Sequence, residues 1–109
     1  MAETIKILGI YSPTIDTYST LYTVPAATSA VISSLVVCNT NNFEAQVRVH
    51  TIPSGSSYDR SNALYYDFPI PANDTLAATL GITMATGDFV GIYSNQSNVN
   101  FFVFGTEMA

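Results

Sequence analysis

Residues 21–39, LYTVPAATSAVISSLVVCN, decide the fold expected for this chain. The stretch opens with a short apolar run at Leu21–Val24, breaks at Pro25, and continues into a β-branched run at Val31–Cys38. A residue before proline favours extended backbone, and proline cannot donate a hydrogen bond to a neighbouring strand. We therefore expect a short strand that ends at a sheet edge. A longer strand, rich in Val and Ile, should follow it and stop at Asn39.

The longer strand is predicted to form a hairpin with the next apolar segment, residues 43–52, around the loop 39–42. If Cys38 lies opposite Phe43, alternation places one nearly all-apolar set of side chains in the core. That set is Ile32, Ser34, Val36 and Cys38 with Phe43, Ala45, Val47 and Val49. A bulge in the loop would shift the register by one residue and exchange the two faces.

The other face of this hairpin is unusual for a sheet that is half exposed to solvent. One strand supplies Glu44, Gln46, Arg48 and His50, whereas its partner places Val31, Leu35 and Val37 beside them. A half-buried antiparallel sheet should alternate cleanly between apolar and polar positions. These apolar side chains are covered either by another segment of the same chain, such as residues 5–10, or by a neighbouring subunit. The predicted assembly contacts are Ile5, Ile7, Val31, Leu35, Val37 and His50.

The remaining sequence adds further short strands separated by turn residues. Residues 4–11 are apolar on both faces, so they form either a central strand or an arm, within residues 1–12, that pairs with a neighbour. Residues 99–107 are also apolar on both faces and are predicted to be central. Seven or eight short strands, with turn signals about every ten residues, predict one all-β domain over residues 1–109. Its architecture should be a two-layer antiparallel β-sandwich, of the jelly-roll or immunoglobulin-like kind.

The composition limits the function. Charged residues make up 10% of the chain, against about 25% in ordinary soluble domains. The surface must therefore be covered by hydroxyl and amide side chains or by other subunits. The net charge is −5, and the only cations are Lys6, Arg48 and Arg60. Because nucleic-acid affinity depends on Lys and Arg at phosphates, we expect no nucleic-acid partner.

The sequence also lacks targeting and disulfide signals. Its start shows no basic segment followed by an apolar one, and no apolar run approaches 18 residues, so neither a secretory signal nor a membrane partner is expected. Cys38 is the only cysteine, so no disulfide within the chain is possible.

We expect no catalytic, metal or cofactor site. In the predicted hairpin, Cys38 lies beside the turn and His50 seven residues beyond Phe43, about 23 Å away, which excludes a Cys-His pair. A structural zinc site needs four Cys or His ligands, and the chain has only these two. The acidic residues give no pair that sequence can place across a cleft.

Two tyrosines near the long polar loop 53–62, Tyr58 and Tyr65, are candidate contacts for a glycan. Tyr65 and Tyr66 must point to opposite faces of their strand, so at most one of them joins Tyr58. The alternative is that these tyrosines pack at the margin of a sheet.

The order of several segments resembles a family of small structural proteins of tailed bacteriophages, common in cyanophages and other aquatic phages. The segments include LYTVPA at residues 21–26, PANDTL at 71–76, LGIT at 80–83, TGD at 86–88 and VFGTE at 103–107. The first two are fairly specific as a pair, and the resemblance spans nearly the whole chain.

This resemblance implies a part of the virion, assembled in the host cytoplasm, with no enzymatic activity. The first expectation is a capsid decoration or cement protein that binds the major capsid protein at capsomer joints as a homodimer or homotrimer. One alternative is a subunit of the tail, baseplate or fibre that binds other tail proteins. Another is a carbohydrate-binding module for host attachment.

Overall fold

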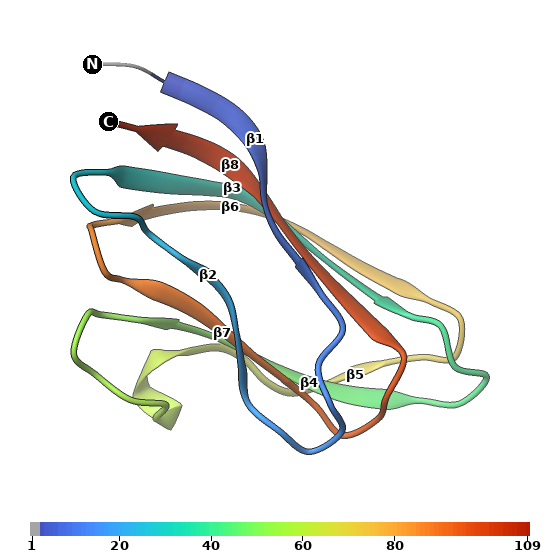
Figure 1. Cartoon of the computed structure of the whole chain (residues 1–109). Helices are drawn as coiled ribbons and strands as arrows, with labels where there is room; N and C mark the ends of the chain where they lie inside the picture. Colours follow the sequence, from blue (N-terminus) through green and yellow to red (C-terminus); the bar gives the residue numbers. More distant parts are fainter. Residues whose placement is uncertain (1–2) are drawn as a thin grey trace.

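The computed structural model describes residues 3–109 and is a sandwich of two four-stranded antiparallel sheets (Figure 1). One 3-10 turn, η1 (Arg60–Asn62), lies in the long polar loop. The strands are β1 (Glu3–Tyr11), β2 (Ser19–Thr23), β3 (Ser29–Asn39), β4 (Ala45–Ile52), β5 (Ala63–Ile70), β6 (Thr75–Met84), β7 (Phe89–Ser94) and β8 (Val99–Met108).

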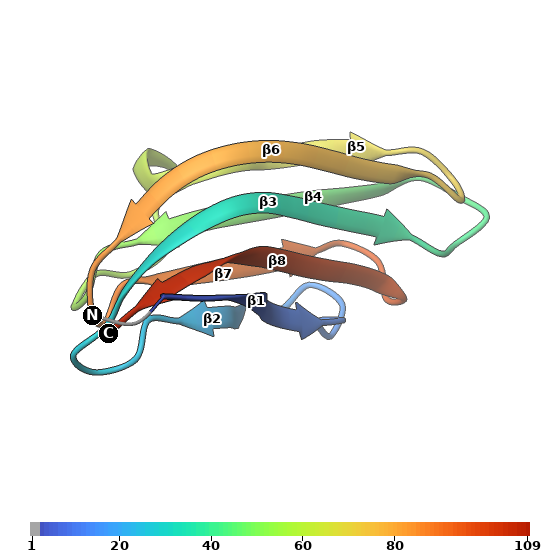
Figure 2. The same cartoon turned by 90° about the horizontal axis from the view of Figure 1, so that it is seen from above.

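The strand order is that of a jelly roll. The first sheet has the order β1-β8-β3-β6 and the second the order β2-β7-β4-β5. The pairs β1–β8, β2–β7, β3–β6 and β4–β5 are nested, as in a long hairpin that has been rolled up. Figure 2 shows the result from above: each strand of one sheet runs above a strand of the other, with β6 over β5 at one side and β1 over β2 at the opposite side. The sandwich prediction is confirmed, and this order selects the jelly roll over the immunoglobulin-like alternative.

The predicted hairpin between β3 and β4 is wrong. The two strands belong to different sheets: β3 pairs with β6 and β8, and β4 pairs with β5 and β7. The loop 40–44 therefore crosses between the layers. Rolling the chain replaces pairing between sequence neighbours with pairing between distant strands, and the local pattern of β3 and β4 carries no sign of this.

The predicted faces of β3 are also wrong after residue 32, because the strand contains a β-bulge. The register against both neighbours shifts between Ile32 and Ser34. Ser33 is exposed at the bulge and donates a hydrogen bond to the Phe104 carbonyl. The extra residue changes the alternation, so that Leu35 and Val37 point inward with Ile32. Val36 and Cys38, predicted to be core, lie half-buried on the outer face.

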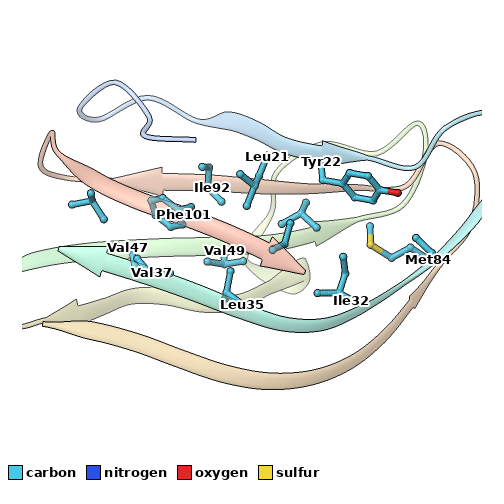
Figure 3. Packing of buried hydrophobic residues seen from close by; sticks show 14 of the residues in the cluster. Leu21, Tyr22, Ile32, Leu35, Val37, Val47, Val49, Met84, Ile92 and Phe101 are labelled. Atoms are coloured by element: carbon cyan, nitrogen blue, oxygen red, sulfur yellow. The ribbon is translucent and has the colours of Figure 1, made fainter. Parts of the chain in front are cut away.

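The core fills the space between the two sheets (Figure 3). Its largest fully buried side chain is Phe101 of β8, which is central in the first sheet as predicted. The inward residues of β4 are Ala45, Val47 and Val49, as expected, whereas Phe43 lies outside the strand and is 49% exposed. Asn39 is a buried polar residue that the sequence did not reveal. Its side-chain nitrogen donates to the carbonyls of Phe43, Ile70 and Pro71.

The two sides of the sandwich are closed differently. At the β1–β2 side, the Lys6 ammonium forms an ion pair with Glu107 at 2.6 Å, and Gly9 packs so closely on the Leu21 carbonyl that no side chain fits. At the β5–β6 side, apolar side chains reach solvent. Leu64 and Phe68 of β5 are 41% and 38% exposed, and the inward residues of β6 before Met84 are only half-buried.

Candidate functional site

The outer face of the first sheet is an apolar surface, formed by rows of side chains that cross the strands. Residues paired directly across an antiparallel sheet share a face, so the rows follow from the register. The row through β1, β8, β3 and β6 at one level is Ile10, Phe102, Val36 and Ala77. The next rows are Ile7, Phe104, Ser34 and Thr79, then Ile5, Thr106, Val31 and Thr83.

We call this surface the apolar face and define it by Ile5, Ile7, Ile10, Val31, Val36, Phe102 and Phe104. None of the twelve side chains in its three rows carries a charge. Ile5 is 86% exposed, Ile7 54% and Ile10 57%, and the rings of Phe102 and Phe104 stack at 6.3 Å. A contiguous uncharged apolar surface of this kind is typical of an interaction site.

The predicted assembly contacts are only partly on this face. Ile5, Ile7 and Val31 lie on it. Leu35 and Val37 are fully buried in the core, so the prediction that they contact a neighbour is wrong; the bulge at Ser33 is the reason. His50 is 1% exposed and belongs to the second sheet, so it does not offer an assembly contact either. Sequence reasoning missed Ile10, Val36, Phe102 and Phe104. An allowance for bulges in β1 and β3 would have found Ile10 and Val36, whereas Phe102 and Phe104 follow only from the pairing of β8 with both strands.

The outer face of the second sheet carries a tyrosine cluster, formed by Tyr18, Tyr58, Tyr66 and Tyr93. Ring centroids lie 4.2 Å apart for Tyr18 and Tyr58, and 5.0 Å apart for Tyr18 and Tyr93. The Arg48 guanidinium lies between Tyr66 and Tyr93, 4.3 and 4.6 Å from their centroids. Such contacts stabilise the cation by its attraction to the negative faces of the rings.

Arg48 and the hydroxyls of Tyr18, Tyr58 and Tyr93 form hydrogen bonds within the chain. Arg48 donates from Nε to Asp67 at 2.6 Å and from Nη1 to the Tyr18 hydroxyl at 3.0 Å. The hydrogen bond to Asp67 raises the pKa of Arg48 above its ordinary value. The Tyr93 hydroxyl donates to Asp16, and that bond raises the pKa of the phenol.

His50 lies beneath the cluster. Its ring makes edge contacts with Tyr18, Tyr58 and Tyr66, and its Nδ1 is 2.7 Å from the Asn62 side-chain oxygen. Within residues 3–109, the Nε2 atom has no hydrogen-bond partner. Cys38 is on the outer face of the other sheet, so the two residues lie in different layers. The hairpin from which their separation was predicted does not exist.

The predicted glycan contacts are not brought together. Tyr58 joins the tyrosine cluster, but its ring packs on Tyr18 and its hydroxyl donates to the Ser19 carbonyl. Tyr65 points toward the core and packs against Phe68 at 5.2 Å, whereas Tyr66 is the strand tyrosine on the outer face. The expected opposition of Tyr65 and Tyr66 is therefore confirmed, and the partner assigned to Tyr58 is wrong.

Other kinds of site are sparse in the described part of the chain. Among residues 3–109, no group of three or more His, Cys, Asp and Glu side chains could hold a metal ion. None of the helical segments in this range is long and apolar enough to cross a membrane. A shallow hollow in the loop 53–62 is lined by Pro53, Ser56, Ser57, Tyr58, Asp59, Ser61 and Asn62.

Neither the scan against protein-family models nor the search of curated proteins finds a match to this chain.

Proposed function

We propose that this chain is a structural subunit of a tailed-phage virion, a decoration protein that binds the capsid through the apolar face. The observation that carries the proposal is the face itself: three rows of uncharged side chains with Ile5, Ile7 and Ile10 largely exposed. Burial of such a surface against a partner is favourable in proportion to the area removed from water. The resemblance of residues 21–26 and 71–76 to phage structural proteins supports the virion as the place where this partner is found.

The proposed mechanism is stabilisation that depends on assembly. A subunit bound across the joint between capsid proteins contributes its contact free energy only when both neighbours are present, so it opposes their separation. The jelly roll supports a binding role by analogy alone, since viral capsid proteins and lectins both use this fold. The role requires no catalytic group and no cofactor.

A subunit of the tail, baseplate or fibre is the second candidate, because the same apolar face would serve there equally well. A glycan-binding role is less favoured, because the rings of Tyr18, Tyr58 and Tyr93 stack on one another or on Arg48. These rings leave few faces free for a sugar.

The location is tested by cryo-electron microscopy and quantitative mass spectrometry of the purified particle. Many copies on the shell would support the decoration role, and a few copies at the tail would support the second candidate. Absence of the chain from the particle would overturn the virion proposal.

The surface is tested by replacing Ile5, Ile7 and Ile10 together by Ser. These side chains are exposed, so the variant should keep its fold, as checked by circular dichroism, and should lose binding to particles that lack the protein. Ile15→Ser is the matched control, because Ile15 is 45% exposed but lies in the loop between β1 and β2, outside the apolar face. This variant should bind the particles as the wild type does. Normal binding by the triple variant would show that the apolar face is not the contact surface.

A further inference from the structure

We propose that two copies of the chain pair antiparallel along β6, so that their two first sheets join into one continuous sheet around a twofold axis. This inference concerns the free edge of β6, where the rows of the apolar face end at Ala77, Thr79 and Thr83, and it does not depend on the virion role. It rests on the edge of β6, on the side chains beside that edge, and on the charge of the chain.

The free edge of β6 lacks most of the features by which proteins usually protect an edge strand; its irregularity is a register shift against β3, where Leu80 and Gly81 lie opposite Ser33. Such features are short length, charge, proline, bulges that turn the edge away, and cover by another segment. β6 ends its sheet, runs for ten residues, and contains neither a charged residue nor a proline between Thr75 and Met84. Figure 2 shows it at the rim of the molecule, with no further strand beside it in its sheet.

The other three edges of the sandwich are protected. β1 carries Lys6 and is bulged between Ile7 and Gly9, where it packs against β2. β2 has only five residues and a register shift of its own. β5 contains Pro69, two register shifts, and Asp67 with a positive φ of 52°. β6 has a register shift as well, but it is the edge strand that combines a length of ten residues with the absence of charge and proline, and this makes it the edge most open to strand pairing.

The side chains at this side of the sandwich are also incompletely buried. The inward side chains of Leu76, Leu80 and Ile82 in β6 are only half-buried. Opposite them, Leu64 and Phe68 of β5 are 41% and 38% exposed. A narrow apolar crevice between the sheets is lined by Leu64, Leu80 and Ile82, together with core residues. A strand added to β6 would place its own inward side chains over these partly exposed apolar residues and bury them.

The charge distribution permits a second copy at this edge. Each copy has a net charge of −5, so two copies repel one another overall, but β6 is an uncharged stretch along which no like charges meet directly. Antiparallel pairing of β6 with itself is an isologous contact, the commonest kind in homodimers. It places the outward threonines, Thr75, Thr79 and Thr83, beside threonine or alanine of the partner, and the inward leucines beside apolar residues.

The area is sufficient for a dimer of modest stability. A strand of ten residues is about 33 Å long, and the shortest extent of the molecule is 20 Å, so the contact reaches about 650 Å² per copy if the edges of both sheets take part. The total of about 1,300 Å² lies within the range of specific protein interfaces. The joined sheet would also place the apolar faces of two copies side by side.

The proposal is tested by sedimentation equilibrium of the purified chain and of Thr79→Lys. Thr79 is exposed on β6, so the variant should fold normally, but two copies would bring lysines close together across the twofold axis. We expect the wild type to dimerise at micromolar concentrations and the variant to dissociate at least about tenfold more readily. Thr83→Lys, at a second exposed position of β6, should weaken the dimer less, because it lies away from the twofold axis and opposite Thr75 of the second copy.

Thr20→Lys is the matched control, since Thr20 is exposed on β2 at the edge of the other sheet. It should leave the dimer intact. Hydrogen exchange should show that backbone amides of β6 are protected in the wild-type dimer and lose protection in Thr79→Lys. A wild type that stays monomeric, a dimer unaffected by Thr79→Lys, or a dimer separated by Ile7→Ser, at the opposite edge of the sheet, would overturn the proposal.

Discussion

The hydroxyl of Tyr22 donates a hydrogen bond to the carboxylate of Glu107, and this bond joins the two sheets at the β1–β2 side of the sandwich. Glu107 also forms an ion pair with Lys6 at 2.6 Å, although only 14% of its side chain is exposed. Burial, followed by the bond to Glu107, raises the pKa of Tyr22. The bonds from Lys6 and Tyr22 in turn hold the pKa of Glu107 below its usual range.

Glu107→Gln is expected to lower the free energy of unfolding by about 1–2 kcal/mol at neutral pH, because hydrogen bonds to a charged group are stronger than neutral ones. The pKa of Glu107 is lower in the folded state, so its contribution is complete above the unfolded-state value of about 4.3. It is lost as the pH falls through the folded-state pKa.

The measurement is urea unfolding of the wild type and of Glu107→Gln at several pH values, from neutral to strongly acidic. It gives the difference in unfolding free energy between the two proteins at each pH. The difference in unfolding free energy between the two proteins should decrease as the pH falls. A difference in unfolding free energy that stays constant down to low pH would contradict the stabilising role of the ionised Glu107 carboxylate.

Two adjacent valines test the faces of β3. Val37 is fully buried, whereas Val36 is half-buried on the apolar face. Val37→Ala should therefore cost about 2 kcal/mol of unfolding free energy through lost burial and a cavity, and Val36→Ala less than about 1 kcal/mol. Thermal or urea unfolding measures both. An equal loss of unfolding free energy in both variants, or a larger loss in Val36→Ala, would contradict the inward position of Val37 and favour the strict alternation expected from the sequence.

Arg48→Lys tests the tyrosine cluster. A lysine keeps the charge but loses the planar stacking between Tyr66 and Tyr93 and the fork of donors to Asp67 and Tyr18. The expected loss is about 1 kcal/mol of unfolding free energy, with altered near-ultraviolet circular dichroism from the tyrosines. Arg60→Lys is the comparison: Arg60 is exposed and lies 5.3 Å from the Tyr66 centroid at the margin of the cluster, so its replacement should lower the melting temperature less than Arg48→Lys. An unchanged spectrum in Arg48→Lys would argue against the cluster.

Two glycines in the first sheet should respond oppositely to alanine. A Cβ atom at Gly105 would overlap the carbonyl oxygen of Val31 on the neighbouring strand, whereas one at Gly81 would meet nothing within 4 Å. Gly105→Ala should therefore destabilise the chain by at least about 2 kcal/mol or prevent folding. Gly81→Ala should be neutral or slightly stabilising, because alanine restricts the unfolded chain. Comparable unfolding midpoints for both variants would contradict the close approach of β8 and β3.

The sequence by itself determined the class of this protein. The β-branched runs, the turn residues and the absence of helical periodicity were sufficient to predict an all-β sandwich. The two apolar faces of residues 99–107 were sufficient to predict that β8 is a central strand. The edge position of β2 followed from Pro25, since its ring removes a backbone donor. These features are local, and local backbone and side-chain preferences decide them.

Only the tertiary structure decided which strands pair and which faces are buried. β3 and β4 follow one another in the sequence but lie in different sheets, because the nested pairing of a jelly roll is a property of the whole chain. The bulge at Ser33 then turned Leu35 and Val37 inward and left Val36 outside. A single extra residue in a strand exchanges its faces, and the register against β6 and β8 that accommodates it forms only when distant segments meet.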